Sequence, residues 1–122
     1  MIDHAVLRVK DLGKSRRFYV AALAPMGYRV LKEFPGFVGL GAGDKTDIWI
    51  GQAEPTTTGV HLAIASRDRR TVDAFHAAAL KAGGKENGAP GVRAHYHPHY
   101  YGAFVIDPDG NNIEAVCHDA NG

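Results

Sequence analysis

Apolar and polar residues alternate in short runs along the chain, separated by two stretches of helical periodicity. The runs HAVLRV and HLAIAS carry apolar residues at every second position, which is typical of strands with one buried face. Apolar residues recur at helical spacing in two other stretches, and we expect helices at about Ser15–Ala24 and Arg69–Ala82. Further short strands are predicted at 28–34, 37–41, 47–51, 91–95, 101–107 and 111–117.

This order of elements occurs twice. Shifted by 57 positions, His4 aligns with His61 and Phe18 with Phe75, and at a shift of 65 Trp49 aligns with Glu114. Each half is therefore predicted to be a β-α-β-β-β module. Module 1 covers about 1–51, a polar linker 52–59 and module 2 about 60–118, within a single domain of residues 1–122. We expect an α+β fold whose two modules form a curved mixed sheet around a cleft.

The composition fits a soluble globular domain and excludes several classes of protein. The 14 Lys and Arg residues nearly balance the 13 Asp and Glu residues, so the chain lacks the excess of positive charge that is typical of nucleic-acid-binding proteins. No apolar run approaches the roughly 18 residues that a membrane span needs. The single cysteine, Cys117, fits a reducing compartment and is expected to be a small buried hydrophobe. We expect a cytoplasmic protein without nucleic-acid or membrane partners.

Two histidines and one glutamate form a candidate metal site. His4 and His61 begin equivalent strands, and the alternation of side chains points both away from the helices, toward the cleft. Glu114 interrupts an apolar strand, where a carboxylate is costly to bury unless it is paired or binds a metal. The turn DPDGN sets a register that puts Phe104 opposite Glu114. Two His and one carboxylate suit a divalent ion with open positions for substrate. Each residue alone also suits a structural role, Glu114 as the partner of an arginine.

Three segments resemble the vicinal oxygen chelate superfamily: IDHAVLRVKDLGKSRRFY, HLAIA and FVIDPDGNNIEAV. Together they span essentially the whole chain. The superfamily includes glyoxalase I, bleomycin-resistance proteins, fosfomycin-resistance thiol transferases and extradiol dioxygenases. The resemblance implies paired βαβββ modules and one divalent metal ion per site (Zn, Ni, Mn or Fe), with His4, His61 and Glu114 as its ligands. It also implies a homodimer, often with sites built from both subunits.

The chain departs from each of these relatives. Glyoxalase I has a second metal-binding carboxylate where the repeat places Trp49, and Asp47 is expected two residues earlier on the same strand face. Fosfomycin-resistance transferases share a His-His-Glu set and a nearby tryptophan, but this chain lacks their arginine-bearing tail. Extradiol dioxygenases also have the His-His-Glu set, but their chains are usually longer. Metal-free bleomycin-binding proteins usually lack this set.

The segment HYHPHYY (residues 95–101) is not part of the resemblance and is specific to this sequence. His95, His97 and His99 alternate, but Pro98 breaks regular strand pairing, which disfavours a separate metal site. The segment is interpreted either as a wall or lid over the cleft or as a mobile surface loop. As a wall, it would supply a histidine as general acid or base and tyrosines that bind substrate oxygens. The candidate catalytic residues are Glu114, His97 and Tyr100, and the candidate substrate-binding residues are Trp49, Arg8, Tyr101 and Phe104.

The expected function is that of a glyoxalase-like, metal-dependent enzyme of the lyase or isomerase type. Its small substrate would be bound through adjacent oxygens, with the metal as Lewis acid. An extradiol-type dioxygenase and a fosfomycin-type thiol transferase are the enzymatic alternatives. A non-catalytic protein that binds an antibiotic or another small toxic compound is the alternative of another class, and a duplicated domain that only associates with partners is a third.

Overall fold

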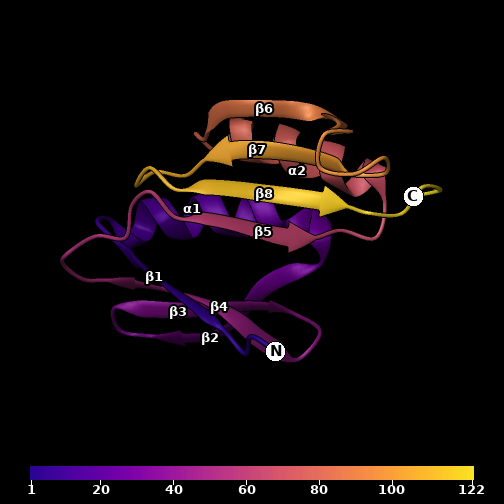
Figure 1. The fold of residues 1–122 in the computed structure, drawn as a ribbon. Coiled ribbons are helices and arrows are strands. Elements are labelled where there is room, and N and C mark those ends of the chain that lie inside the picture. Colours follow the sequence, from indigo (N-terminus) through magenta and orange to yellow (C-terminus); the bar gives the residue numbers. More distant parts are fainter.

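The computed structural model describes residues 1–122, and its order of elements repeats once along the chain. The first unit comprises β1 (Ala5–Val9), α1 (Leu12–Leu23), the 3₁₀ turn η1 (Ala24–Met26), β2 (Tyr28–Phe34), β3 (Phe37–Ala42) and β4 (Lys45–Gln52). The second unit comprises β5 (His61–Ala65), α2 (Arg69–Lys81), β6 (Lys85–Val92), β7 (Tyr101–Ile106) and β8 (Asn112–Cys117). Figure 1 shows the strands of the first unit below those of the second.

Each unit forms a four-stranded mixed sheet, and the two sheets have matching strand orders. The order is β1-β4-β3-β2 in the first unit and β5-β8-β7-β6 in the second. The first and last strands of each unit pair in parallel, and the other neighbours are antiparallel. The predicted α+β class with two βαβββ modules is therefore confirmed. The strands form two separate sheets within the chain rather than one continuous sheet (Figure 1).

An aspartate caps the start of each helix. The Asp11 side chain accepts a hydrogen bond of 3.1 Å from the Lys14 amide, and Asp68 caps α2 in the same way. The cap at Asp11 starts α1 at Leu12, three residues before the predicted Ser15. Neither helix is long and apolar enough to cross a membrane.

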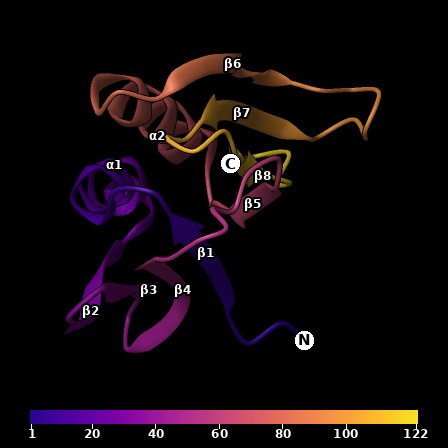
Figure 2. The same cartoon turned by 90° about the vertical axis from the view of Figure 1, so that its left-hand side faces the viewer.

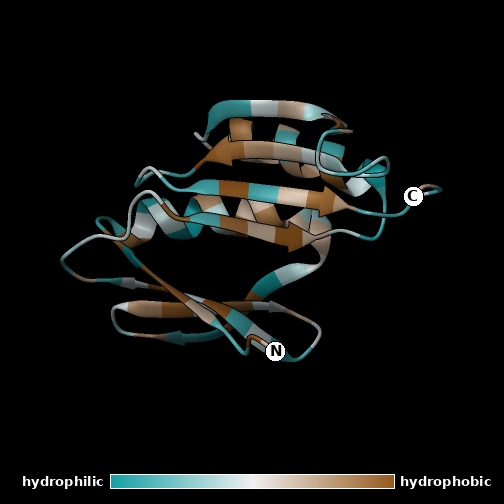
Figure 3. Cartoon of the chain, in the orientation of Figure 1, coloured by the Kyte–Doolittle hydropathy of each residue, from teal (hydrophilic) through white to brown (hydrophobic).

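The two helices join the modules in one hydrophobic core. α1 packs on the strands of the first sheet, α2 packs on those of the second, and the helices contact each other (Figure 2). The repeat-equivalent residues Phe18 and Phe75 are both fully buried in this core, as is Cys117. Hydrophilic and hydrophobic positions alternate in the first half of β8, and Ile113 and Ala115 pack in the core (Figure 3).

A buried polar network at the β7–β8 turn also links the modules. Tyr19 of α1 donates a hydrogen bond to Asp107, and the Asn111 side chain donates to Asp107 and to the Thr57 carbonyl, both at 3.0 Å. The turn has the predicted form: Asp107 N–H donates to the Asn111 carbonyl at 2.9 Å, and Gly110 has a φ of 90°. The turn of the second module is thereby fixed against the helix of the first.

One strand lies earlier in the sequence than predicted. The strand expected at 91–95 is β6 at Lys85–Val92, because the residues after it form turns instead of pairing. Tyr96 N–H donates to the Arg93 carbonyl at 2.9 Å, and Tyr100 N–H donates to the His97 carbonyl at 3.1 Å. The segment HYHPHYY therefore belongs largely to the loop between β6 and β7, as the proline in it favours.

Candidate functional site

A histidine and a buried glutamate meet on neighbouring parallel strands of the second sheet. Glu114 lies on β8 with only 1% of its surface exposed, and His61 begins the adjacent β5. The His61 Nε2 atom lies 2.7 Å from Glu114 Oε1, while the His61 side chain is 53% exposed. The register also places Phe104 opposite Glu114, as predicted, with its ring 6.0 Å from the imidazole. The pair thus joins a carboxylate in the protein interior to an imidazole that solvent can reach.

Tyr100 engages the second oxygen of the same carboxylate. Its hydroxyl donates a hydrogen bond to Glu114 Oε2, so that both carboxylate oxygens have partners. Burial, and then this hydrogen bond, raise the pKa of Tyr100 well above its usual range, which keeps the phenol protonated as a donor. Gly102 leaves room for the contact, because a Cβ there would lie 3.1 Å from both Glu114 Oε2 and the Tyr100 ring.

His4 lies in a different place, directly before β1 of the first sheet. Its side chain is 48% exposed, and its Nδ1 atom lies 2.7 Å from Asp3 Oδ1, which lowers the pKa of Asp3. Together with Val6, Phe37 and Trp49 it lines an apolar pocket of about 290 Å³. Trp49, which the repeat aligns with Glu114, thus lines the same pocket as His4.

The chain does not bring its three candidate metal ligands together. His4 lines the pocket on the first sheet, and His61 lines another pocket on the second. No group of three His, Cys, Asp or Glu side chains in the chain lies close enough to hold a metal ion. The expected cleft with both histidines facing each other is absent because the helices, and not the sheet faces, join the modules.

Asp47 does not share a strand face with Trp49, so this prediction was wrong. The β3–β4 pairing shifts register between Leu40 and Gly41, which is a bulge that interrupts the alternation of faces. Asp47 therefore does not lie beside Trp49. It accepts a hydrogen bond of 2.9 Å from the Tyr28 hydroxyl and lines a separate pocket near the second module. Burial raises the pKa of Tyr28, and the bond to Asp47 adds to this.

Three other predicted site residues lie apart from Glu114. His97 Nε2 lies 2.6 Å from His118 Nδ1, and the His97 ring packs against the Tyr100 ring at 5.4 Å. The Tyr101 hydroxyl donates to a carboxylate of α2, Asp73, at 2.6 Å, because strand alternation turns Tyr101 toward the helix. Arg8 is exposed and lines none of the pockets. His97 thus reaches the carboxylate only through Tyr100.

The sequence reasoning missed a polar pocket beside His61. This pocket has a volume of about 350 Å³ and is lined by His61, Asn87, Arg93, Tyr96, Phe104 and Asn112. Asn112 lies two residues before Glu114, so strand parity alone places both on one face. Asn87 and Arg93 come from the other side of the β6–β7 hairpin, whose irregular pairing no sequence pattern revealed.

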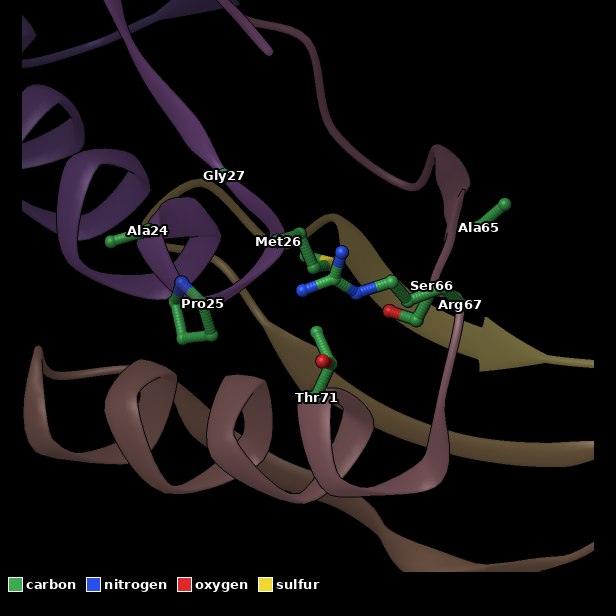
Figure 4. Close-up of a pocket in the computed structure, with 8 residues that line it drawn as sticks. All are labelled: Ala24, Pro25, Met26, Gly27, Ala65, Ser66, Arg67 and Thr71. Carbon is green, nitrogen blue, oxygen red and sulfur yellow. The ribbon is translucent and has the colours of Figure 1, made fainter. Parts of the chain in front are cut away.

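Another pocket lies where the two modules meet. It has a volume of about 370 Å³ and is lined by η1 together with the segment from the end of β5 to the start of α2. Figure 4 shows the Arg67 guanidinium between Met26 and Thr71. None of the predicted site residues lines this pocket, so we do not assign the candidate site to it.

The fold and the paired openings of the modules define a known class of protein, in which two βαβββ modules carry the site on their sheets. A profile of the Glyoxalase/Bleomycin resistance protein/Dioxygenase superfamily matches residues 1–115. The chain therefore belongs to this superfamily. A search of curated proteins finds no match.

Solved structures agree with this assignment. A glyoxalase/bleomycin resistance protein from Albidiferax ferrireducens T118 is 30% identical, with a TM-score of 0.84 over 96% of this chain and 98% of that one. A hypothetical protein from S. aureus is 25% identical, with a TM-score of 0.67 over 92% of both chains. Glyoxalase I from Zea mays is 25% identical, with a TM-score of 0.71, and the match covers 98% of this chain but 45% of the maize enzyme.

Proposed function

We propose that this protein is a divalent-metal-dependent enzyme of the lyase or isomerase type, acting on a small substrate bound through adjacent oxygens. The observation that supports this most is the His61–Glu114 pair, in which a buried carboxylate lies 2.7 Å from an accessible imidazole. Burying a carboxylate is costly, and the strand offers it one imidazole and one phenol rather than an arginine. An imidazole and a carboxylate are two of the ligand types that divalent transition metals and zinc bind.

The donor set fits a divalent ion if a third ligand is added. His61 Nε2 and Glu114 Oε1 already face each other, so a cation would replace the proton that they share. His4 supplies the third ligand, as the superfamily relationship implies. A metal ion so bound supplies Lewis-acid polarisation of the substrate oxygens. Tyr100 holds the free carboxylate oxygen and so fixes the orientation of Glu114 as a ligand.

We infer that His4 comes from a second copy of the chain. The His4 pocket lies on a sheet whose outer face exposes large apolar residues, Val6 at 58% and Phe37 at 43%. Apolar residues exposed together are typical of a protein interface. In a two-fold homodimer, the first sheet of one copy would cover the second sheet of its partner and complete two identical sites. The side chains of Phe37 and Trp49 would then form an apolar wall opposite His61 and Phe104.

Elemental analysis of tag-free protein tests the metal proposal. We expect about one equivalent of a divalent transition metal or zinc per chain, lost in His61→Ala and in Glu114→Ala. His76→Ala is the matched control, because His76 also pairs with a glutamate, Glu86, at 2.8 Å but outside the site. A metal-free protein, even after anaerobic reconstitution with iron, manganese, nickel or zinc, would contradict the proposal and favour a binding protein without turnover.

The identity of the metal then selects the assay. Bound iron favours the extradiol-type dioxygenase, which oxygen uptake would reveal, whereas zinc, nickel or manganese favours isomerase or thiol-addition substrates. A molar mass of twice the 13.1 kDa chain, measured by light scattering, tests the homodimer separately. A monomer that retained the metal would contradict the shared site alone.

A further inference from the structure

The pocket beside His61 contains an arginine whose positive charge no carboxylate neutralises. Arg93 lines this pocket, and none of the ion pairs in the chain includes it. No aspartate or glutamate lines the pocket either. The charge facing this space is therefore positive, in a protein whose formal net charge is only +1.

The backbone of β6 holds the Arg93 guanidinium in one orientation. Nη1 donates to the Gly91 carbonyl at 2.9 Å, and Nη2 donates to the Ala89 carbonyl at 2.8 Å. Gly88 and Gly91 make room for this fold of the side chain, because a Cβ at either position would lie 3.2 Å from a terminal guanidinium nitrogen. The two bonds use two of the five N–H donors of the guanidinium and leave three for a ligand.

Apart from Arg93 and His61, the groups that line the pocket are uncharged side chains. The guanidinium carbon lies 5.4 Å from the centre of the Phe104 ring, which is stacked beneath the charge. Asn87 donates to the Asn112 side chain at 3.2 Å, and the Tyr96 ring borders the pocket on the loop side. Arg93 is the one arginine or lysine that lines the pocket, which matches a singly charged oxyanion, and its planar fork matches a carboxylate.

We propose that Arg93 binds a carboxylate of the ligand, so that the substrate is a small monocarboxylate with an apolar body that lies on Phe104. That this ligand is a substrate rests on the function proposed above, whereas its binding to Arg93 does not depend on the metal. Arg93 would fix one end of the molecule, and the other end would extend toward His61, which lines the same pocket.

Titration of metal-free protein with benzoate and with benzamide, its uncharged isostere, tests this proposal. The two probes share the ring and differ in charge. Backbone amide shifts of Phe104 and Asn112, followed by nuclear magnetic resonance, report on the pocket. We expect saturable shifts with benzoate and at least about tenfold weaker binding of benzamide. Arg93→Gln should weaken benzoate binding by about tenfold or more and leave benzamide unchanged, and Arg93→Lys should restore part of the benzoate affinity.

Arg29→Gln is the matched control, because the Arg29 guanidinium also donates to a backbone carbonyl, that of Gly43 at 3.5 Å, but Arg29 lines no pocket. It should bind benzoate like the unaltered chain. Equal binding of the two probes, absence of shifts at about 50 mM benzoate, or full benzoate affinity in Arg93→Gln would overturn the proposal. Because the protein is free of metal, failure of the metal proposal would leave this result unaffected.

Discussion

The phenol oxygen of Tyr19 on α1 lies 2.5 Å from Asp107 Oδ2 in the β7–β8 turn, and both residues are buried. Tyr19 belongs to the first module and Asp107 to the second, so this hydrogen bond joins the two halves of the chain. The same turn precedes β8, which carries Glu114. The contact that holds the modules together therefore also fixes the position of the candidate site.

Removal of this hydroxyl should destabilise the whole chain. In Tyr19→Phe, Asp107 keeps its bonds from the amides of Asp109 and Asn111 but loses its bond to the phenol. Loss of a hydrogen bond to a buried carboxylate costs about 1–3 kcal/mol of the free energy of unfolding. Urea unfolding followed by circular dichroism measures this cost. A free energy equal to that of the unaltered chain would show that the two modules do not depend on this bond.

Stability should also fall as the pH rises above the usual tyrosine range. Burial, and then the charge of Asp107, raise the pKa of Tyr19. Burial also raises the pKa of Tyr28 and of Tyr100, and the hydrogen bond to Asp73 raises that of Tyr101. The unfolded chain loses these protons first, near pH 10, while the folded chain keeps them. The stabilising contribution is therefore complete below about pH 10 and is lost as the pH rises further.

Urea unfolding at about pH 8, 10 and 11 checks this dependence. We expect a shallower loss of stability in Tyr19→Phe than in the unaltered chain, because one proton with a raised folded-state pKa has been removed. If both proteins lose stability at the same rate, Tyr19 does not contribute to the alkaline transition.

Local signals were sufficient to predict the strand that carries Glu114. The DPDGN turn fixes the register of β7 and β8, because Gly110 adopts the positive φ that the predicted loop requires. Phe104 and Glu114 then face each other by simple alternation. The repeat likewise predicts equivalent positions for His4 and His61, and the structure places His4 directly before β1 and His61 at the first residue of β5.

Features that depend on irregular strand pairing could not be predicted from the sequence. The bulge at Asp47 removes this residue from its expected face, and two register shifts in the β6–β7 pairing precede Arg93. The sequence also does not predict that the modules pack together through α1 and α2. The apolar face of an amphipathic helix shows that the helix is packed against something, but not against which element. For this reason no sequence pattern predicted that His4 lies apart from His61 and Glu114 in the chain.

Tyr100→Phe should weaken metal binding without unfolding the protein. The phenol holds Glu114 Oε2, and loss of a hydrogen bond that orients a ligand typically costs 10–100-fold in metal affinity. Competition with a chromophoric chelator for zinc measures the affinity. Tyr28→Phe is the matched control, because its hydroxyl also donates to a carboxylate, that of Asp47, but outside the site. Equal losses in both variants would indicate a general effect on the fold.

A heterodimer of two different variants should regain one metal site of its two. Neither the His4→Ala homodimer nor the His61→Ala homodimer is expected to hold metal, because each lacks a ligand in both sites. In a heterodimer of the two, one site combines both substitutions, and the other combines the intact His4 of one copy with the intact His61 and Glu114 of its partner. Heterodimers purified through two different affinity tags should therefore contain about half of the metal content of the unaltered dimer. If each chain built its site alone, both sites of the heterodimer would lack a ligand, and elemental analysis would find no recovery.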